Sequence, residues 1–239
     1  MFRAARKRRE SNSAQGFRMR GHEITRLESF SDAVFAFALT LLVVSLEVPE
    51  SFTELFDTMR GFVAFGVCFA ILARIWNAHY VYCRRYGLDD GLVRFLTCVL
   101  LFIVLLYVYP LKFLFTLFIN KTLLGIETGQ PRITSDQAAT LFVIYGFGFS
   151  AVYIALTFLY LQAYRLRDDL DLNALERLET RWEIYGLLCQ MAVGLISAGL
   201  AVILHGRDVV WAGFVYFSLF AIMQVHGLLH SPQGLAAAV

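Results

Sequence analysis

An aspartate stands inside an apolar run near the start of the chain. The run, from Arg26 to Pro49, reads RLESFSDAVFAFALTLLVVSLEVP, and Asp32 lies at the head of its hydrophobic part. A carboxylate within a membrane-spanning helix is costly, and it normally faces the bundle interior and a partner group. Asp32 could therefore contact an ion, act in catalysis beside a second group, or join two helices through hydrogen bonds.

Donors for that carboxylate occur in the next apolar block. The stretch ARIWNAHYVYCRRY places Trp76 and His79 three residues apart, so they share one face of a helix. The indole and imidazole N–H groups are natural donors to a carboxylate, and Ser31 adds a hydroxyl. We predict that Asp32 and Ser31 bond to Trp76 or His79, as a strut worth roughly 1 kcal/mol between two helices in lipid.

A second pattern occupies the same first block. Phe37, Thr40, Leu41 and Val44 recur at spacings of three and four, and so form one stripe on a helix. At about 100° per residue, Asp32 lies about 140° around the helix from Phe37. If the stripe faces a partner or a pore, Asp32 faces sideways into its own bundle.

The elements that position these residues follow from composition. The chain has 239 residues, of which 58% are hydrophobic and 17% charged, with a mean hydropathy of +0.61. Its apolar residues come in blocks long enough to cross a bilayer, which takes about 20 residues of helix. The sequence therefore predicts an all-α membrane protein with six transmembrane helices, near Ser29–Val48, Phe56–Tyr82, Leu92–Ile119, Ala138–Tyr164, Glu183–His205 and Val209–Leu229. Gly146 and Gly148 are expected to loosen the fourth helix.

The distribution of basic residues predicts the orientation. Arginine and lysine concentrate before the first span and in the second and fourth connections, which places both termini in the cytoplasm of a multi-pass cell-membrane protein. We divide the chain into a basic cytoplasmic tail (1–25), a membrane domain (26–230) and a short cytoplasmic C-terminal tail (231–239). The basic tail is expected to be disordered near anionic lipid, since a nucleic-acid role needs a soluble context. The fourth connection, 165–182, suits a short amphipathic helix or an extension of the flanking spans.

The sequence argues against a metal site, structural disulfides, a cofactor and an enzyme active site. The four cysteines lie in or beside apolar blocks without CxxC spacing, which argues against a zinc site and against structural disulfides. No glycine-rich phosphate loop or hydrolase motif is present, so no cofactor is implied. Only Asp32 with His79 could form a catalytic pair at membrane depth, and two residues make a poor active site. We therefore expect no enzyme and no nucleic-acid partner.

The residues around Asp32 also carry a resemblance. Arg26, Phe30, Ser31 and Asp32 spell RxxxFSD at the head of the first span, and Trp76 and His79 follow on the second. Together with six spans and this length, the pattern resembles the transmembrane protein 175 family of potassium channels, in its single-repeat prokaryotic form.

The resemblance implies a homotetramer in the lipid bilayer, with four copies of the first helix around a central pore for potassium ions. Members have no carbonyl-lined filter; a ring of large apolar side chains forms the constriction, and a threonine ring follows. Carried onto this chain, these rings are Phe37 and Thr40, with Leu41 and Val44 completing the lining; the family's usual residue at the constriction is Ile or Leu. The implied function is a leak-type channel with modest preference for K⁺ over Na⁺, whose hydrophobic constriction is both gate and filter. Apart from the permeating ion, no metal is implied.

Other functions remain open on the sequence. A secondary transporter or a proton-conducting membrane protein of the same layout is the main alternative, and a structural scaffold is another. Transporters are commonly built from internal repeats with broken helices, and the first three spans show no convincing match to the last three. The channel is therefore the favoured prediction.

Overall fold

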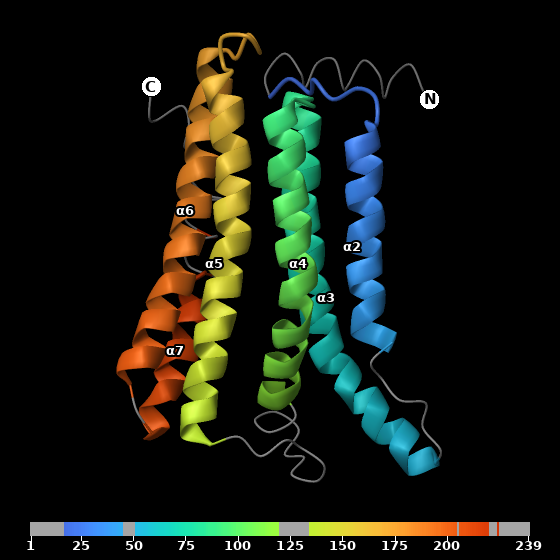
Figure 1. Ribbon diagram of the computed structural model, residues 1–239, viewed down its shortest axis with the longest axis vertical. Helices are drawn as coiled ribbons and strands as arrows, with labels where there is room; N and C mark the ends of the chain where they lie inside the picture. The colour runs from blue at the N-terminus through green and yellow to red at the C-terminus, as the bar shows by residue number, and fades with distance from the viewer. Residues whose placement is uncertain (1–16, 45–50, 120–133, 205, 220–223, 225–239) are drawn as a thin grey trace.

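All regular elements in the described part of the chain are helical, as the sequence predicts. The computed structural model describes residues 17–44, 51–119, 134–204, 206–219 and 224 (Figure 1). The elements are α2 (Arg26–Val44), α3 (Phe52–Tyr86), α4 (Gly91–Phe118), α5 (Ser135–Arg165), α6 (Ala174–Ile203), η2 (Gly206–Val209), α7 (Val210–Phe214) and η3 (Val215–Phe217).

Four described helices contain segments long and apolar enough to cross a membrane. These segments are Phe62–Tyr86, Gly91–Phe118, Asp136–Arg165 and Ala174–Ile203. The first predicted span corresponds to α2, whose 19 residues would extend about 28 Å at the usual helical rise. The last predicted span does not form one continuous helix over its described part, because residues 206–217 divide into η2, α7 and η3. Most of its second half lies outside the described residues.

The long helices run side by side along the longest axis of the molecule, with α5 next to α6 and the start of α3 tilted away from the bundle (Figure 1). Residues 17–25 cross the ends of α3 and α4 before α2 begins. The same end of the bundle holds the α3–α4 connection (87–90) and the α5–α6 connection (166–173). We call it the basic end.

Local signals set the helix boundaries at the basic end. Gly87 follows α3 with a φ of +61°, the left-handed conformation that glycine adopts most easily, and its N–H donates to the Cys83 carbonyl at 2.9 Å. Asp90 then caps α4, accepting from the backbone N–H groups of Leu92 (2.8 Å) and Val93 (2.9 Å).

The α5–α6 connection extends a flanking helix, which is the second of the two structures that the sequence allowed for residues 165–182. Residues 166–171 form turns, and α6 begins at Ala174, well before the predicted start near Glu183. Asn173 and Glu176 form a capping box: Asn173 Oδ1 accepts from the Glu176 N–H (2.8 Å), and Glu176 Oε2 from the Asn173 N–H (3.0 Å). The connection thus extends a flanking helix and contains no separate amphipathic helix.

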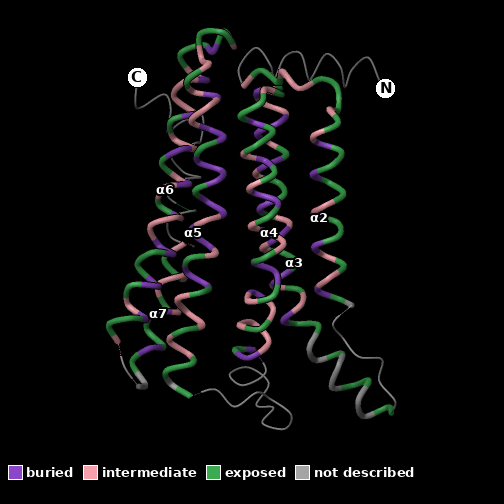
Figure 2. Tube along the Cα trace, in the orientation of Figure 1, coloured by how far each residue is buried: buried purple, intermediate pink, exposed green. Residues whose placement is uncertain are grey.

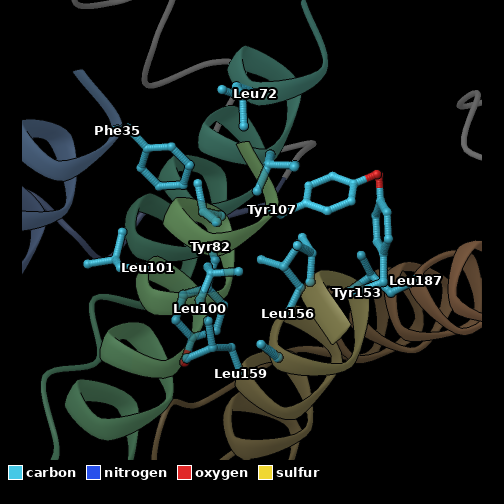
Figure 3. Close-up of a cluster of buried hydrophobic side chains, with 14 of the residues drawn as sticks. Phe35, Leu72, Tyr82, Leu100, Leu101, Tyr107, Tyr153, Leu156, Leu159 and Leu187 are labelled. Atoms are coloured by element: carbon cyan, nitrogen blue, oxygen red, sulfur yellow. The ribbon is translucent and has the colours of Figure 1, made fainter. Parts of the chain in front are cut away.

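The core lies along α4, which packs against α2, α3 and α5. Its inward face buries residues at helical spacing, and the burial follows the inner sides of the neighbouring helices (Figure 2). Leucines and tyrosines from α3, α4 and α5 meet there, among them Tyr82, Leu100, Tyr107 and Leu156 (Figure 3). The outer faces carry many exposed apolar side chains, as expected for surfaces that contact lipid or another copy of the chain.

Glycines bring α5 and α6 together. A Cβ atom on Gly194 would lie 2.4 Å from Ser150 Oγ and 2.9 Å from the Gly146 carbonyl oxygen, so only glycine fits. Ser150 Oγ donates to the Met191 carbonyl at 3.0 Å across the same crossing. The expectation that Gly146 and Gly148 loosen the fourth span is therefore wrong: α5 is continuous, and Gly146 permits close helix packing.

The crossing gives a first prediction. Gly194→Ala should destabilise the protein by about 1–3 kcal/mol, because the added methyl group overlaps Ser150 and the α5 backbone. Gly199 lies on the same helix with nothing within 4 Å of its Cβ position, so Gly199→Ala is the matched control. The melting temperature of the detergent-purified protein should fall only for Gly194→Ala; equal effects would contradict the packing role.

Candidate functional site

The helix α2 has two distinct faces. Ser31, Phe35, Ala38 and Leu42 are buried at spacings of four, three and four, and so face α3 and α4. Phe37 projects from the opposite side and is 57% exposed. The tube in Figure 2 shows the same alternation of buried and exposed turns along α2. The predicted stripe therefore points away from the protomer's own bundle.

The stripe combines apolar surface with one hydroxyl layer. Thr40 is exposed, and its Oγ1 donates to the Phe37 carbonyl at 2.7 Å, so its hydrogen is used within the helix. The Thr40 oxygen can still accept a hydrogen bond or contact a cation from outside the protomer. Leu41 is half-buried beside it, and the side chain of Val44 lies outside the described residues.

Asp32 is joined to α3 through Trp76. The indole Nε1 donates to Asp32 Oδ1 at 2.7 Å, and the indole ring stacks on Tyr80 with centroids 5.6 Å apart. Ser31 does not share this bond, because its hydroxyl donates to the Leu27 carbonyl within α2 at 2.8 Å. Of the contacts that the sequence suggested, the structure brings Asp32 and Trp76 together.

His79 makes a different connection. Its side chain is 2% exposed, and Nε2 lies 3.4 Å from Thr97 Oγ1 on α4. Its ring also lies near Phe35, with centroids 6.5 Å apart. His79 therefore joins α3 to α4 behind α2. Thr97 lies in an apolar block with no distinguishing local pattern, so the sequence did not indicate this contact.

A second link between α2 and α3 lies nearer the basic end. Glu28 Oε2 is 3.5 Å from Arg84 Nη2, and the Arg84 guanidinium lies over the Tyr80 ring at 5.5 Å. Glu28 is one helical turn before Asp32, and Arg84 is two turns after Trp76. Their opposite charges, both on the basic-end side of the Asp32–Trp76 bond, are the signal by which the pair could have been found.

The far end of α2 is held by a lysine. Lys112 on α4 donates from Nζ to the Leu42 carbonyl at 2.9 Å, within the last turn of α2. Carbonyl groups at a helix C-terminus lack intrahelical donors, and a cation there also interacts well with the helix dipole. A single lysine inside an apolar block was the sequence signal for this contact.

The RxxxFSD residues do not form one cluster. Arg26 begins α2 and is exposed, as is Phe30; Ser31 faces inward and Asp32 reaches α3. Among the described residues, no group of three or more His, Cys, Asp or Glu side chains could hold a metal ion. The four motif residues therefore leave α2 in different directions, and Asp32 is the one that bonds to α3.

Comparisons with known proteins agree with this architecture. Residues 26–107 match the family described as "Endosomal/lysosomal potassium channel TMEM175", over α2, α3 and part of α4. A potassium channel of Marivirga tractuosa is 39% identical over 227 residues, covering 91% of this chain and 92% of the relative. A potassium channel of Streptomyces collinus is 26% identical over 203 residues, covering 81% and 93%.

A solved structure is similar over nearly the whole chain. The crystal structure of a variant of the potassium channel MtTMEM175, in complex with a nanobody–MBP fusion protein, aligns with a TM-score of 0.80 at 36% identity. The alignment covers 90% of this chain and 97% of that one. The helix bundle and the relatives together identify a multi-pass membrane protein of the potassium channel class. Channels are not enzymes. The chain belongs to the TMEM175 family of potassium channels.

The Asp32–Trp76 bond gives a second prediction. A double-mutant cycle with Asp32→Ala, Trp76→Phe and both changes should give a coupling free energy of about 1 kcal/mol, because each change alone breaks the same interhelical hydrogen bond. The free energy of unfolding in detergent micelles is the measurement. Tyr80→Leu with Asp32→Ala is the control pair, since Tyr80 contacts the indole ring and not the carboxylate. Additive effects of Asp32→Ala and Trp76→Phe would contradict the strut.

Proposed function

We propose that this protein is a potassium channel in which four copies of α2 surround a central pore. The observation that carries the proposal is the outward stripe on α2, with Phe37 and Thr40 opposite the face that packs on α3 and α4. Ala33 and Ala36 are exposed on the same side, and small residues there would let copies of α2 approach closely. Membership of a potassium channel family supports the same arrangement.

The proposed constriction works through hydration. Four Phe37 rings would form an apolar ring, which closes by dewetting and makes an ion shed part of its water on passage. Potassium holds its water less tightly than sodium, so the constriction favours K⁺ by a modest factor. Thr40 oxygens one turn further along would replace some of the lost water, and aromatic faces attract cations.

A secondary transporter is the main competing function. Transporters of that kind form their substrate sites at discontinuous helices near the bilayer midplane. In the part of the chain that the structure describes, the four membrane-length helices are each continuous, which supports a static pore over alternating access. Proton leakage along a hydrated constriction is compatible with the channel.

The proposed orientation places the basic end in the cytoplasm of the cell. The described basic residues of the N-terminal segment and of both connections gather there, including Arg18, Arg84, Arg94, Arg165 and Arg177. Cytoplasmic loops of membrane proteins carry such an excess of arginine and lysine. On this reading residues 26–230 form the membrane domain, between cytoplasmic segments 1–25 and 231–239.

The constriction gives a third prediction. Phe37→Ala should raise K⁺ flux and lower the preference for K⁺ over Na⁺, because the smaller side chain leaves a wider, hydrated path. The measurement is flux of each ion into liposomes that contain the purified protein. Phe102→Ala is the control, since Phe102 is 68% exposed on α4, outside the proposed pore. A constriction elsewhere would be indicated if Phe37→Ala changed neither quantity while the wild type conducted.

The hydroxyl layer gives a fourth prediction. Thr40→Val keeps the side-chain shape and removes the oxygen, so the preference for K⁺ should fall by about fivefold, or about 1 kcal/mol, with little change in expression. Thr140→Val is the matched control, because Thr140 is an exposed threonine on α5 that also donates to its own helix (3.0 Å). Unchanged selectivity would remove Thr40 from the filter, and a wild type that carries no cation would end the channel proposal.

A further inference from the structure

Residues 17–25 pack against the basic end of the bundle, although the sequence predicts a disordered tail there. The backbone N–H groups of Arg20 and Gly21 both donate to the Arg84 carbonyl, at 3.1 Å each. The Phe17 ring meets Tyr86 edge-on at 5.5 Å, and the Arg85 guanidinium lies over it at 4.9 Å. We call residues 17–25 the N-terminal strap.

The strap is anchored on one buried carboxylate. Glu176, in the first turn of α6, is 0% exposed. Its Oε1 accepts from the Arg18 backbone N–H (2.8 Å) and Nε (3.3 Å), and its Oε2 accepts from Arg20 Nη2 (2.8 Å). Two arginines, 158 and 156 residues away in sequence, thus converge on a single acid.

Backbone carbonyls of the α5–α6 connection also accept hydrogen bonds from the two arginines. The Leu170 carbonyl accepts from Arg20 Nε at 2.9 Å, and the Asp171 carbonyl accepts from both Arg18 and Arg20. Asp171 has a φ of +50°, a left-handed conformation that is uncommon for residues other than glycine. The turn directs its carbonyl groups toward the arginines and so adds acceptors that carry no charge.

The Glu176 side chain is fully buried, while those of Arg20 and Arg18 are 18% and 48% exposed, so losing an arginine leaves a buried carboxylate short of a partner. A buried ion pair is strongly destabilised when one partner is removed, because the other charge is left without compensation. The bond from Arg18 to Glu176 and the negative charge of that carboxylate raise the pKa of the Arg18 guanidinium. Arg18 therefore stays charged, and the strap stays bound, as long as Glu176 is ionised.

The strap is joined directly to α2. Thr25 Oγ1 accepts from the Glu28 N–H at 3.1 Å, and Glu28 Oε1 accepts in return from the Thr25 N–H at 3.5 Å. Glu28 also pairs with Arg84, whose Nη1 donates to the Gly21 carbonyl at 2.7 Å. A movement of the strap is thus transmitted to the first turn of α2.

We propose that Glu176 is a positioning residue for the pore: by holding Arg18 and Arg20 it fixes the strap, and with it the basic end of α2. The effect on ion flux rests on the channel function proposed above. Loss of the anchor would let the ends of the α2 copies separate, so the constriction would hydrate more often and K⁺ flux would rise. The preference for K⁺ over Na⁺ would fall, because an ion sheds less of its water in a wider, hydrated constriction.

The test is Glu176→Gln in the full-length protein. Glutamine preserves the side-chain acceptor of the capping box and removes the charge that holds the arginines. Tryptic cleavage after Arg18 and Arg20, followed by mass spectrometry, should become about tenfold faster, because a strap without its charge-assisted bonds opens more often. K⁺ flux into liposomes should rise by about threefold, with a fall in the K⁺-to-Na⁺ flux ratio.

Two further variants make the test specific. Asn173→Ala breaks the same capping box and leaves the carboxylate in place, so it should leave cleavage and flux near wild-type values. Arg20→Gln removes one of the partners, and it should raise both cleavage after Arg18 and K⁺ flux, which keeps the proposal testable if Glu176→Gln does not fold.

The outcomes separate the two proposals. Unchanged cleavage in Glu176→Gln and Arg20→Gln would overturn the anchor, and faster cleavage with unchanged flux would overturn the positioning role. A wild type without cation flux would overturn the channel function, while the cleavage rates would still decide whether Glu176 anchors the strap.

Discussion

Polar groups that enter the apolar interior of this bundle need partners from the protein itself, because hydrocarbon supplies none. That constraint fixes the rotation of α2. The exposed Asp32 carboxylate accepts from the Trp76 indole on α3, and the Leu42 carbonyl accepts from Lys112 on α4. With both ends of the helix held in this way, the side that carries Phe37 has no place in the protomer's own core. The outward stripe is thus a consequence of where the polar residues must go.

The same constraint shapes the rest of the membrane region. Arg74 on α3 donates to Gln190 Oε1 on α6 at 3.0 Å, which joins two helices that otherwise belong to different parts of the bundle. Where α5 and α6 cross, glycine removes the side chains, and Ser150 bonds directly to the α6 backbone. Without a hydrophobic driving force between helices in lipid, such close contacts and interhelical hydrogen bonds supply the specificity.

At the basic end, ion pairs join the helices to one another. Arg85 reaches Glu183 on α6 at 3.1 Å, while Arg18 and Arg20 converge on Glu176. Exposed pairs of this kind contribute little, but buried ones bind their members together because losing one partner leaves the other charge uncompensated. The helices of the basic end are thereby joined to the segment that leads into α2, so the position of the proposed pore helix depends on residues far from the stripe.

The sequence alone determined the helical class, the approximate position of four membrane-length helices, the family through the RxxxFSD motif, and the contact of Asp32 with α3. The helices depend on local composition and on the period of a single helix, and the motif on neighbouring residues, all of which a sequence displays directly. It did not determine that Trp76 and not His79 would meet Asp32, that Gly146 serves close packing, that residues 206–217 break into short helices, or that the strap would fold onto Glu176. Those outcomes depend on the rotation and register of one helix against another. Only the tertiary structure decided them, because hydrogen bonds and contacts between distant segments form after the helices have packed.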